Sequence, residues 1–122
     1  MKKYNRDLGT YGESLAIEHI LHKGYEVLDK NYKCAVGEID IIAKQGEVLA
    51  FIEVKSRLSS YFGKPLESIN YIKKNRIIKA SKLYLQKNRL FNFFIRYDVI
   101  EITFLKDIHN YKINLLQDAF RL

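Results

Sequence analysis

The sequence predicts one domain of the α/β or α+β class, with a mixed central sheet flanked by helices. Segments with helical and strand-like periodicity follow one another in the order α-β-β-β-α-β-β. Two central strand segments carry apolar side chains on both faces, which indicates layers above and below the sheet. A chain of 122 residues with one proline has the length of a single domain with one core, so we expect the domain to span residues 1–122.

The composition is basic and favours an anionic partner such as nucleic acid. Lys and Arg number 21 against 14 Asp and Glu, which gives a net charge of +7 and an isoelectric point near 9.4. The single cysteine, Cys34, excludes an internal disulfide and a cysteine-rich zinc site. The first residues lack the apolar core of a signal peptide, and no apolar run approaches the ~18 residues of a membrane span. We therefore expect a soluble, cytoplasmic protein without a membrane partner.

The first helix is expected at Thr10–Lys23, after frayed residues 1–9. Thr10 has the character of an N-cap, Glu13 would complete a capping box, and Gly24 is the expected C-cap. Four apolar residues share one arc of this helix: Ala16, Ile17, Ile20 and Leu21. Glu13 falls near the centre of that arc, where an acid is costly unless it is compensated. Glu13 therefore either caps the helix or belongs to a site.

Three strands are expected next. Tyr25–Tyr32 alternates loosely and is placed near an edge, and a loop at Asn31–Gly37 leads to a hairpin of Glu38–Lys44 and Val48–Lys55. The apolar hairpin residues are assigned to two faces. One face takes Ile39, Ile41, Val48, Ile52 and Val54, and the other takes Ile42, Leu49 and Phe51.

Two acids and a lysine stand at the end of this apolar hairpin. A turn on Gly46 and Glu47 places Asp40 directly opposite Glu53, whereas a turn one residue earlier places the two acids diagonally. In both cases the carboxylates share one face with Lys55, because side chains alternate with period two. Charges in such an apolar setting require a functional or ion-paired explanation.

A second, longer helix is expected from Leu66 or Ser68 to Asn88, after a substrate-contacting loop at Ser56–Pro65. Its inward arc is assigned to Ile69, Ile72, Ile77, Ala80, Leu83 and Tyr84. Lys73 and Arg76 lie within the same arc, so they must reach a negative group or extend to the edge of the apolar surface.

The last two strands are expected to pair as a hairpin. After a connector at Arg89–Phe94, the segment Ile95–Leu105 is strongly strand-like, and Tyr111–Gln117 follows it closely. Alternation puts Arg96, Asp98 and Ile100 on one side of the first of these strands and Tyr97 and Val99 on the other.

The charged residues of the central hairpin fit a site for metal-dependent phosphodiester hydrolysis. Mg²⁺ takes oxygen ligands, typically one or two carboxylates together with waters. Asp40 and Glu53 would provide these, with the Val54 carbonyl as a third ligand, and Lys55 would act on the water or stabilise the developing charge. Glu13 would bind a second metal or orient a water. The alternative is an internal ion pair of Lys55 with the two hairpin acids.

The same residues carry a resemblance to known nucleases. An acid on a first helix, followed by D-(x)n-E-x-K in this order of elements, is similar to the PD-(D/E)xK nuclease superfamily, close to its Holliday-junction resolvase branch. Nearly the whole chain resembles the bacterial YraN family of endonuclease-like proteins, through the segments GTYGESLAIEHILHKGYEVLDKNY, GEIDIIA, FIEVKSR, RIIKASKLYL, RYDVIEI and DAF. Ile39 stands where the superfamily has proline, which is not a ligand.

The resemblance implies a restriction-endonuclease-like core and a function. It gives Asp40 and Glu53 as metal ligands, Lys55 as the catalytic lysine and Glu13 as the helix acid. Lys73 would contact substrate, and Arg57 and Arg76 are further basic candidates. The expected function is a Mg²⁺- or Mn²⁺-dependent endonuclease that hydrolyses DNA phosphodiester bonds, on branched or structured DNA.

Three alternatives remain open from the sequence: a nucleic-acid binding protein of this fold without strong cleavage, a hydrolase of RNA or nucleotides, and a structural protein with ion-paired carboxylates. The histidines are scattered and are interpreted as non-catalytic: His19, His22 and His109. By analogy with junction resolvases, a homodimer is expected, with Ile78, Leu85 or the LFNFF segment at its interface.

Overall fold

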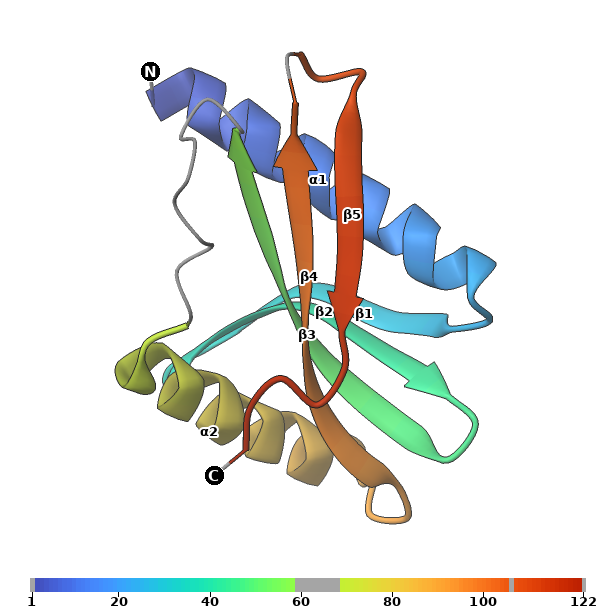
Figure 1. The fold of residues 1–122 in the computed structure, drawn as a ribbon. Helices are drawn as coiled ribbons and strands as arrows, with labels where there is room; N and C mark the ends of the chain where they lie inside the picture. The colour runs from blue at the N-terminus through green and yellow to red at the C-terminus, as the bar shows by residue number, and fades with distance from the viewer. Residues whose placement is uncertain (1, 59–68, 106, 122) are drawn as a thin grey trace.

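The computed structural model describes residues 2–58, 69–105 and 107–121. Within these ranges the chain forms two helices and a five-stranded mixed sheet, which confirms the expected order of elements (Figure 1). The elements are α1 (Lys2–His22), β1 (Glu26–Cys34), β2 (Gly37–Gln45), β3 (Val48–Leu58), α2 (Tyr71–Asn88), β4 (Phe94–Phe104) and β5 (Tyr111–Leu116). Neither described helix combines the length and apolar character needed to cross a bilayer.

The five strands lie in the order β1-β2-β3-β4-β5. All neighbours are antiparallel except β3 and β4, which run parallel. A parallel pair needs a crossover connection, and here the crossover contains α2. The edge position predicted for the first strand and the hairpin predicted for the last two are both confirmed.

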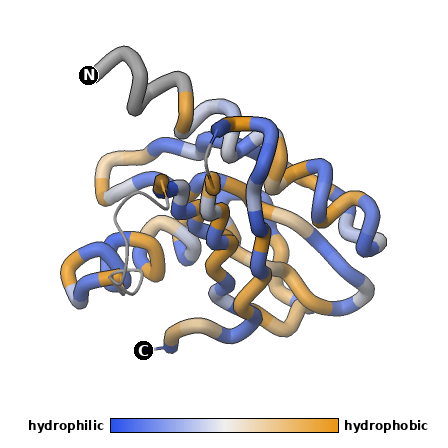
Figure 2. Tube along the Cα trace, turned by 45° about the horizontal axis from the view of Figure 1, so that its top comes forward, coloured by the Kyte–Doolittle hydropathy of each residue, from blue (hydrophilic) through white to orange (hydrophobic). Residues whose placement is uncertain are grey.

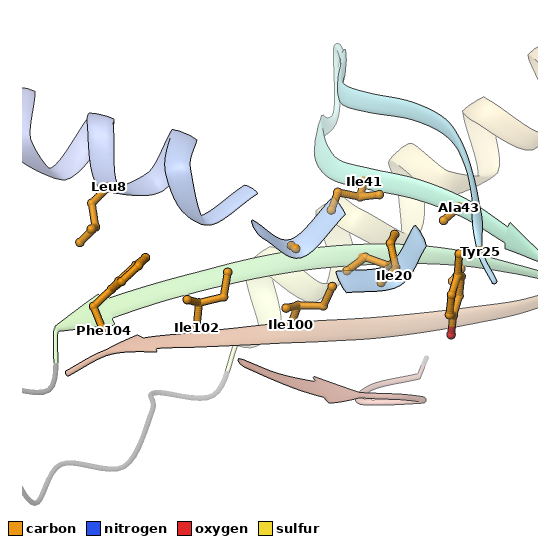
Figure 3. Close-up of a cluster of buried hydrophobic side chains, with 11 residues drawn as sticks. Leu8, Ile20, Tyr25, Ile41, Ala43, Ile100, Ile102 and Phe104 are labelled. Carbon is orange, nitrogen blue, oxygen red and sulfur yellow. The ribbon is translucent and has the colours of Figure 1, made fainter. Parts of the chain in front are cut away.

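The helices cover opposite faces of the sheet, and each face has its own apolar core. Both helices alternate between hydrophobic and hydrophilic residues along their turns (Figure 2). Figure 3 shows the core beneath α1, which includes Leu8, Ala16, Ile20, Ile41, Ile52, Ile100, Ile102 and Phe104. The core beneath α2 includes Ile39, Ile42, Leu49, Phe51, Ile77, Ile78, Ala80, Tyr84 and Val99.

The first helix is longer than predicted. It begins at Lys2, so residues 2–9 are helical rather than frayed, and Thr10 lies inside the helix instead of capping it. The Thr10 carbonyl accepts a hydrogen bond from the Ser14 hydroxyl, so the predicted capping box is wrong. Leu8 is buried on the sheet, and tertiary packing of this kind outweighs weak local propensity. The predicted C-cap is confirmed: Gly24 has φ of +87°, and its amide donates to the Leu21 carbonyl.

The buried face of α2 also differs from the prediction. Ile72 and Leu83 are 63% and 41% exposed, although both were expected inward. Ile78, expected on the far side, is 3% exposed. Ser81 is fully buried on the same face, and its hydroxyl is satisfied by the Ile78 carbonyl at 2.6 Å and the Tyr97 hydroxyl at 2.7 Å. The predicted arc did not include Ser81, and the face that buries it is turned toward Ile78 and away from Ile72 and Leu83.

The start of α2 is set by Asn70, whose side chain accepts a hydrogen bond from the Lys73 amide at 2.8 Å. The predicted starts at Leu66 and Ser68 lie outside the described residues. Most of the predicted Ser56–Pro65 loop lies there too, and its first three residues are strand because β3 continues to Leu58. The Ile78 and Leu85 patch is not a free surface, since both residues pack in the α2 core.

The central hairpin has the predicted turn at Gly46 and Glu47, which pairs Ile41 with Ile52 and so places Asp40 opposite Glu53. The backbone ladder between β2 and β3 ends at the Ile41–Ile52 pair. Beyond it, Oδ2 of Asp40 accepts a hydrogen bond from the Val54 amide at 2.8 Å. A side chain thus takes over the role of the backbone at the point where the two strands stop pairing.

Strict alternation fails next to Asp40. Ile39 packs in the α2 core whereas Ile41 packs in the α1 core, so assigning both to one face was wrong. On the neighbouring strand β1, Tyr32 pairs with Ile39 and Lys30 pairs with Ile41. Asn31 lies between them and adopts φ of 52°, in the left-handed region. The strand β1 continues past it to Cys34, so most of the loop predicted at Asn31–Gly37 is strand.

Candidate metal-binding site

Side chains from both helices and the central hairpin converge on a pocket of about 260 Å³, which we call the carboxylate pocket. Its lining comes from α1, β2, β3 and α2: Leu8, Gly9, Glu13, Glu38, Asp40, Glu53, Val54, Ser56 and Lys73. The α1 wall can approach β3 closely only because residue 12 is glycine, since a Cβ there would overlap the Ser56 hydroxyl.

The structure brings together most of the predicted site. Glu13, Asp40, Glu53 and Val54 all line the carboxylate pocket, as expected from the sequence. Glu53 is 6% exposed, whereas Asp40 is partly buried and held by the Val54 amide. With Lys73 of α2, four chain segments contribute to one site, and the docking of both helices determines its geometry.

Burial and mutual repulsion raise the pKa of the acids in this pocket. Burial, followed by the negative charge of Asp40, raises the pKa of Glu53 to about 7. Burial also raises the pKa of Asp40, although hydrogen bonds from Val54 and Glu53 oppose the change. The pKa of Glu13 is raised by burial and then by the charges of Asp40 and Glu38. The pocket therefore favours the uptake of positive charge, either a proton or a cation.

Lys73 supplies part of that positive charge. Its Nζ lies 2.9 Å from Oε1 of Glu53, and its side chain remains 44% exposed. Burial alone would lower the pKa of Lys73, but contacts with Glu53 and the charge of Asp40 raise it. The prediction that Lys73 must reach a negative group is confirmed. The cation paired with the hairpin acids is thus Lys73, not Lys55 as the ion-pair alternative supposed.

The remaining basic candidates do not line the carboxylate pocket. Lys55 follows Glu53 by two residues on β3, but it does not line the carboxylate pocket and forms no ion pair within the described part of the chain. Arg57 lies further along β3 and is partly buried. Arg76 is exposed on α2, one turn beyond Lys73. Among the predicted basic residues, Lys73 alone reaches the pocket.

Sequence reasoning missed Glu38 and Ser56 as members of the site. The signal for Glu38 was present, because an acid two residues before Asp40 belongs to the same short segment of β2. Ser56 carried no such signal, since its place depends on how closely α1 approaches β3. Its hydroxyl is buried without a hydrogen-bond partner among the described residues, so it could donate to a ligand in the pocket.

The donors present fit a hard divalent cation. Carboxylates and a backbone carbonyl are the oxygen ligands that Mg²⁺ and Mn²⁺ prefer. Within the described ranges no three His, Cys, Asp or Glu side chains form a ready-made cage. Two carboxylates with open positions nevertheless suit Mg²⁺, which keeps several waters or substrate oxygens. Asp40, Glu53 and the Val54 carbonyl would hold the ion, with Glu13 beside it.

The stability of the metal-free protein is expected to rise as the pH falls from about 8 to about 5. A pKa for Glu53 near 7 in the folded state exceeds its ordinary value of 4.5, so the folded protein binds the proton more tightly than the unfolded chain. The gain is on the order of 3 kcal/mol in the free energy of unfolding. Urea unfolding in chelator at several pH values would measure it, and Glu53→Gln should flatten the dependence. An equally steep rise in Glu53→Gln would contradict the assignment.

Sequence comparisons place the chain among clostridial relatives. It is 52% identical to a UPF0102 protein of Clostridium perfringens strain 13 and 45% identical to one of Clostridium tetani, in both cases over the full length of each chain. A UPF0102 protein of Clostridium botulinum strain Alaska E43 is 45% identical over 99% of each chain. The profile of the uncharacterised protein family UPF0102 matches residues 12–102, which include every lining residue of the carboxylate pocket except Leu8 and Gly9. The chain belongs to the uncharacterised protein family UPF0102.

Proposed function

We propose that the protein is a Mg²⁺- or Mn²⁺-dependent endonuclease that hydrolyses DNA phosphodiester bonds, with a restriction-endonuclease-like core of the PD-(D/E)xK type. One observation carries the proposal. Asp40 and Glu53 are held in contact at the end of an apolar hairpin, with raised pKa values that a divalent cation would relieve. The resemblance to the YraN family and the basic charge of the chain support the same function.

The residues of the pocket divide the chemistry among them. Asp40, Glu53 and the Val54 carbonyl would hold the metal, which when bound neutralises phosphate oxygens and acidifies water. The raised pKa of Glu13 brings it closer to neutral pH, where a carboxylate is an effective proton acceptor. Lys55 would stabilise the charge that develops on the phosphate or leaving oxygen. Lys73, whose side chain is paired with Glu53 and 44% exposed, would bind a phosphate oxygen of the substrate.

A basic chain with one cysteine and an acidic metal site fits a cytoplasmic protein that acts on branched or structured DNA. Symmetric cleavage of a branched substrate needs two copies, so a homodimer is part of the proposal. The exposed aromatic residues Phe91 and Phe94, at 68% and 71% exposure, are the remaining candidates for its interface. Ile78 is not, because it is buried within the protomer.

The proposal is tested by a cleavage panel of linear, flapped and four-way-junction DNA, with RNA of matched sequence, in Mg²⁺, Mn²⁺ and chelator. We expect metal-dependent cleavage of at least one branched DNA. Cleavage of RNA alone would move the function to RNA hydrolysis. Tight, salt-dependent binding to DNA without cleavage in either metal would favour a nucleic-acid binding protein of this fold.

A further inference from the structure

A second hollow, of about 820 Å³, adjoins the carboxylate pocket. It lies between the β1–β2 turn and the first turns of α2, and its lining includes Lys33, Cys34, Val36, Ile72, Arg76 and Ile77. Glu38 and Lys73 line both hollows, so the two lie next to each other. We call this hollow the turn groove.

The turn groove is built from elements that are fixed against one another. A Cβ on Gly37 would lie 3.1 Å from both the Cβ and the carbonyl oxygen of Arg76, so the hairpin turn packs directly on α2. The thiol of Cys34 donates to the Gly37 carbonyl across 3.4 Å, which links the two ends of the turn. On the other wall, Asn70 caps α2 one residue before the helix begins. The groove is therefore a preformed feature of the fold.

The charged side chains of the turn groove are mostly basic. Lys33, Lys73 and Arg76 line it against one acid, Glu38. Lys33 and Arg76 are exposed, and no ion pair involving either is seen among the described residues. These cations suit the phosphates of a nucleic-acid strand. The scissile phosphate of such a strand would have to approach the acids of the neighbouring carboxylate pocket.

Two apolar side chains are exposed within the same groove. Ile72 is 63% exposed and Val36 is 36% exposed, although both line the groove. A ligand that contacted the groove only through its phosphates would leave these two side chains in water. Unpaired bases have apolar faces that can cover them. A duplex keeps its bases stacked and paired, so it would offer only its backbone to the groove.

We propose that the turn groove binds an unpaired nucleic-acid segment next to the scissile phosphodiester bond. Lys33 and Arg76 contact its phosphates, Val36 and Ile72 contact its bases, and Lys73 lies where the segment enters the carboxylate pocket. This assignment rests on the proposed function and makes it more specific, because it requires a substrate with a single-stranded part beside the cleavage point.

The first test is binding in chelator, so that cleavage plays no part. Fluorescence anisotropy would compare single strands, duplexes and flapped DNA with the double variant Lys33→Glu/Arg76→Glu. The matched control is Lys79→Glu/Lys82→Glu, which makes the same charge change on exposed residues of α2 outside the groove. We expect the groove variant to weaken single-strand binding by at least tenfold more than the control. The slope of log K against log salt concentration should become shallower by about 0.7 for each phosphate that the variant no longer neutralises. Equal effects of the two double variants would overturn the proposal.

The second test uses Cys34, the one cysteine of the chain, as a reporter within the groove. Single-stranded and flapped DNA should slow its alkylation by iodoacetamide, and duplex of equal length should slow it less. Equal protection by duplex, or protection by polyglutamate but not by single strands, would overturn the proposal. The native thiol needs no substitution, so misfolding of a variant does not affect this result.

The two proposals fail in different ways. Protection of Cys34 by single strands without any metal-dependent cleavage would support the groove and reject the nuclease. Metal-dependent cleavage of DNA with Cys34 unprotected and the groove variant fully active would reject the groove alone. A protein that binds no nucleic acid in either test would reject both.

Discussion

Replacing Asp40 by asparagine is expected to abolish divalent-cation binding and to reduce DNA cleavage by more than about 100-fold. Removing groups that merely support a metal ligand already costs about 10- to 100-fold, and Asp40 is a proposed ligand itself. The amide oxygen can still accept the hydrogen bond from the Val54 amide, so the end of the hairpin should stay intact. Removing the charge should also lower the pKa of Glu53, because the Asp40 carboxylate is one cause of its rise. Calorimetric titration with Mn²⁺ would measure the binding.

Lys55→Ala is the matched control for Asp40→Asn. Lys55 does not line the carboxylate pocket, so this variant should bind Mn²⁺ like the parent protein. It should still lose cleavage, because the proposed role of Lys55 is to stabilise the charge that develops on the phosphate or leaving oxygen. If Asp40→Asn bound Mn²⁺ as tightly as the parent, the carboxylate pocket would not be the metal site. If the parent bound no metal and Asp40→Asn were strongly destabilised, the acids would be a structural ion-pair cluster with Lys73.

Replacing Asp98 by alanine is expected to lower the free energy of unfolding by about 3–5 kcal/mol, the usual cost of removing one partner of a buried ion pair. Asp98 is fully buried, and both its oxygens accept from Nε of Arg96, at 2.9 and 3.1 Å. Oδ1 also accepts from the Asp118 amide at 2.8 Å, which joins the C-terminal segment to β4. Arg96 in turn donates to the Tyr25 hydroxyl, and in the variant its guanidinium would keep this hydrogen bond but lose both of those to Asp98. Urea unfolding at pH 7 would measure the effect.

Asp118→Asn is the control for the loss of stability expected in Asp98→Ala. Asp118 pairs with Arg121 at the surface, where solvent screens ion pairs and they contribute little to stability. Asparagine tolerates the φ of 55° at this position, so the substitution adds little backbone strain. We therefore expect a much smaller change in the free energy of unfolding than for Asp98→Ala. A similarly small change in Asp98→Ala would show that the buried network contributes little to stability.

The sequence predicted the hairpin and its acids because local rules decide both. A glycine-containing turn determined the register of Asp40 and Glu53, and alternation held over most of the strands. The features that the sequence did not predict depend on contacts between segments far apart in the chain. The start of α1 at Lys2 was missed, and Leu8 in this added part of the helix packs against the sheet. Ser81 is buried in α2 beside Tyr97 of β4, whose hydroxyl lies 2.7 Å from its own.

The basic side chain that pairs with Glu53 also could not be predicted from local sequence patterns. Lys55 is two residues from Glu53 in sequence, and this proximity made it the expected partner. The observed partner is Lys73, which α2 brings from twenty residues further along the chain. Its position depends on how a whole helix docks against the sheet, and no local pattern carries that information.

The end of the β2–β3 ladder at Ile52 also bears on self-association. In the described ranges, residues 53–58 of β3 pair with β4 but with no strand on the other side. An unpaired strand edge is a template on which another chain can add by backbone hydrogen bonding, and natural proteins guard such edges with inward-pointing charges. Asp40 already occupies the Val54 amide, and Glu53 puts a carboxylate at the start of this edge. The acids that make the site suitable for a cation thus also keep the open edge from joining two molecules into one continuous sheet.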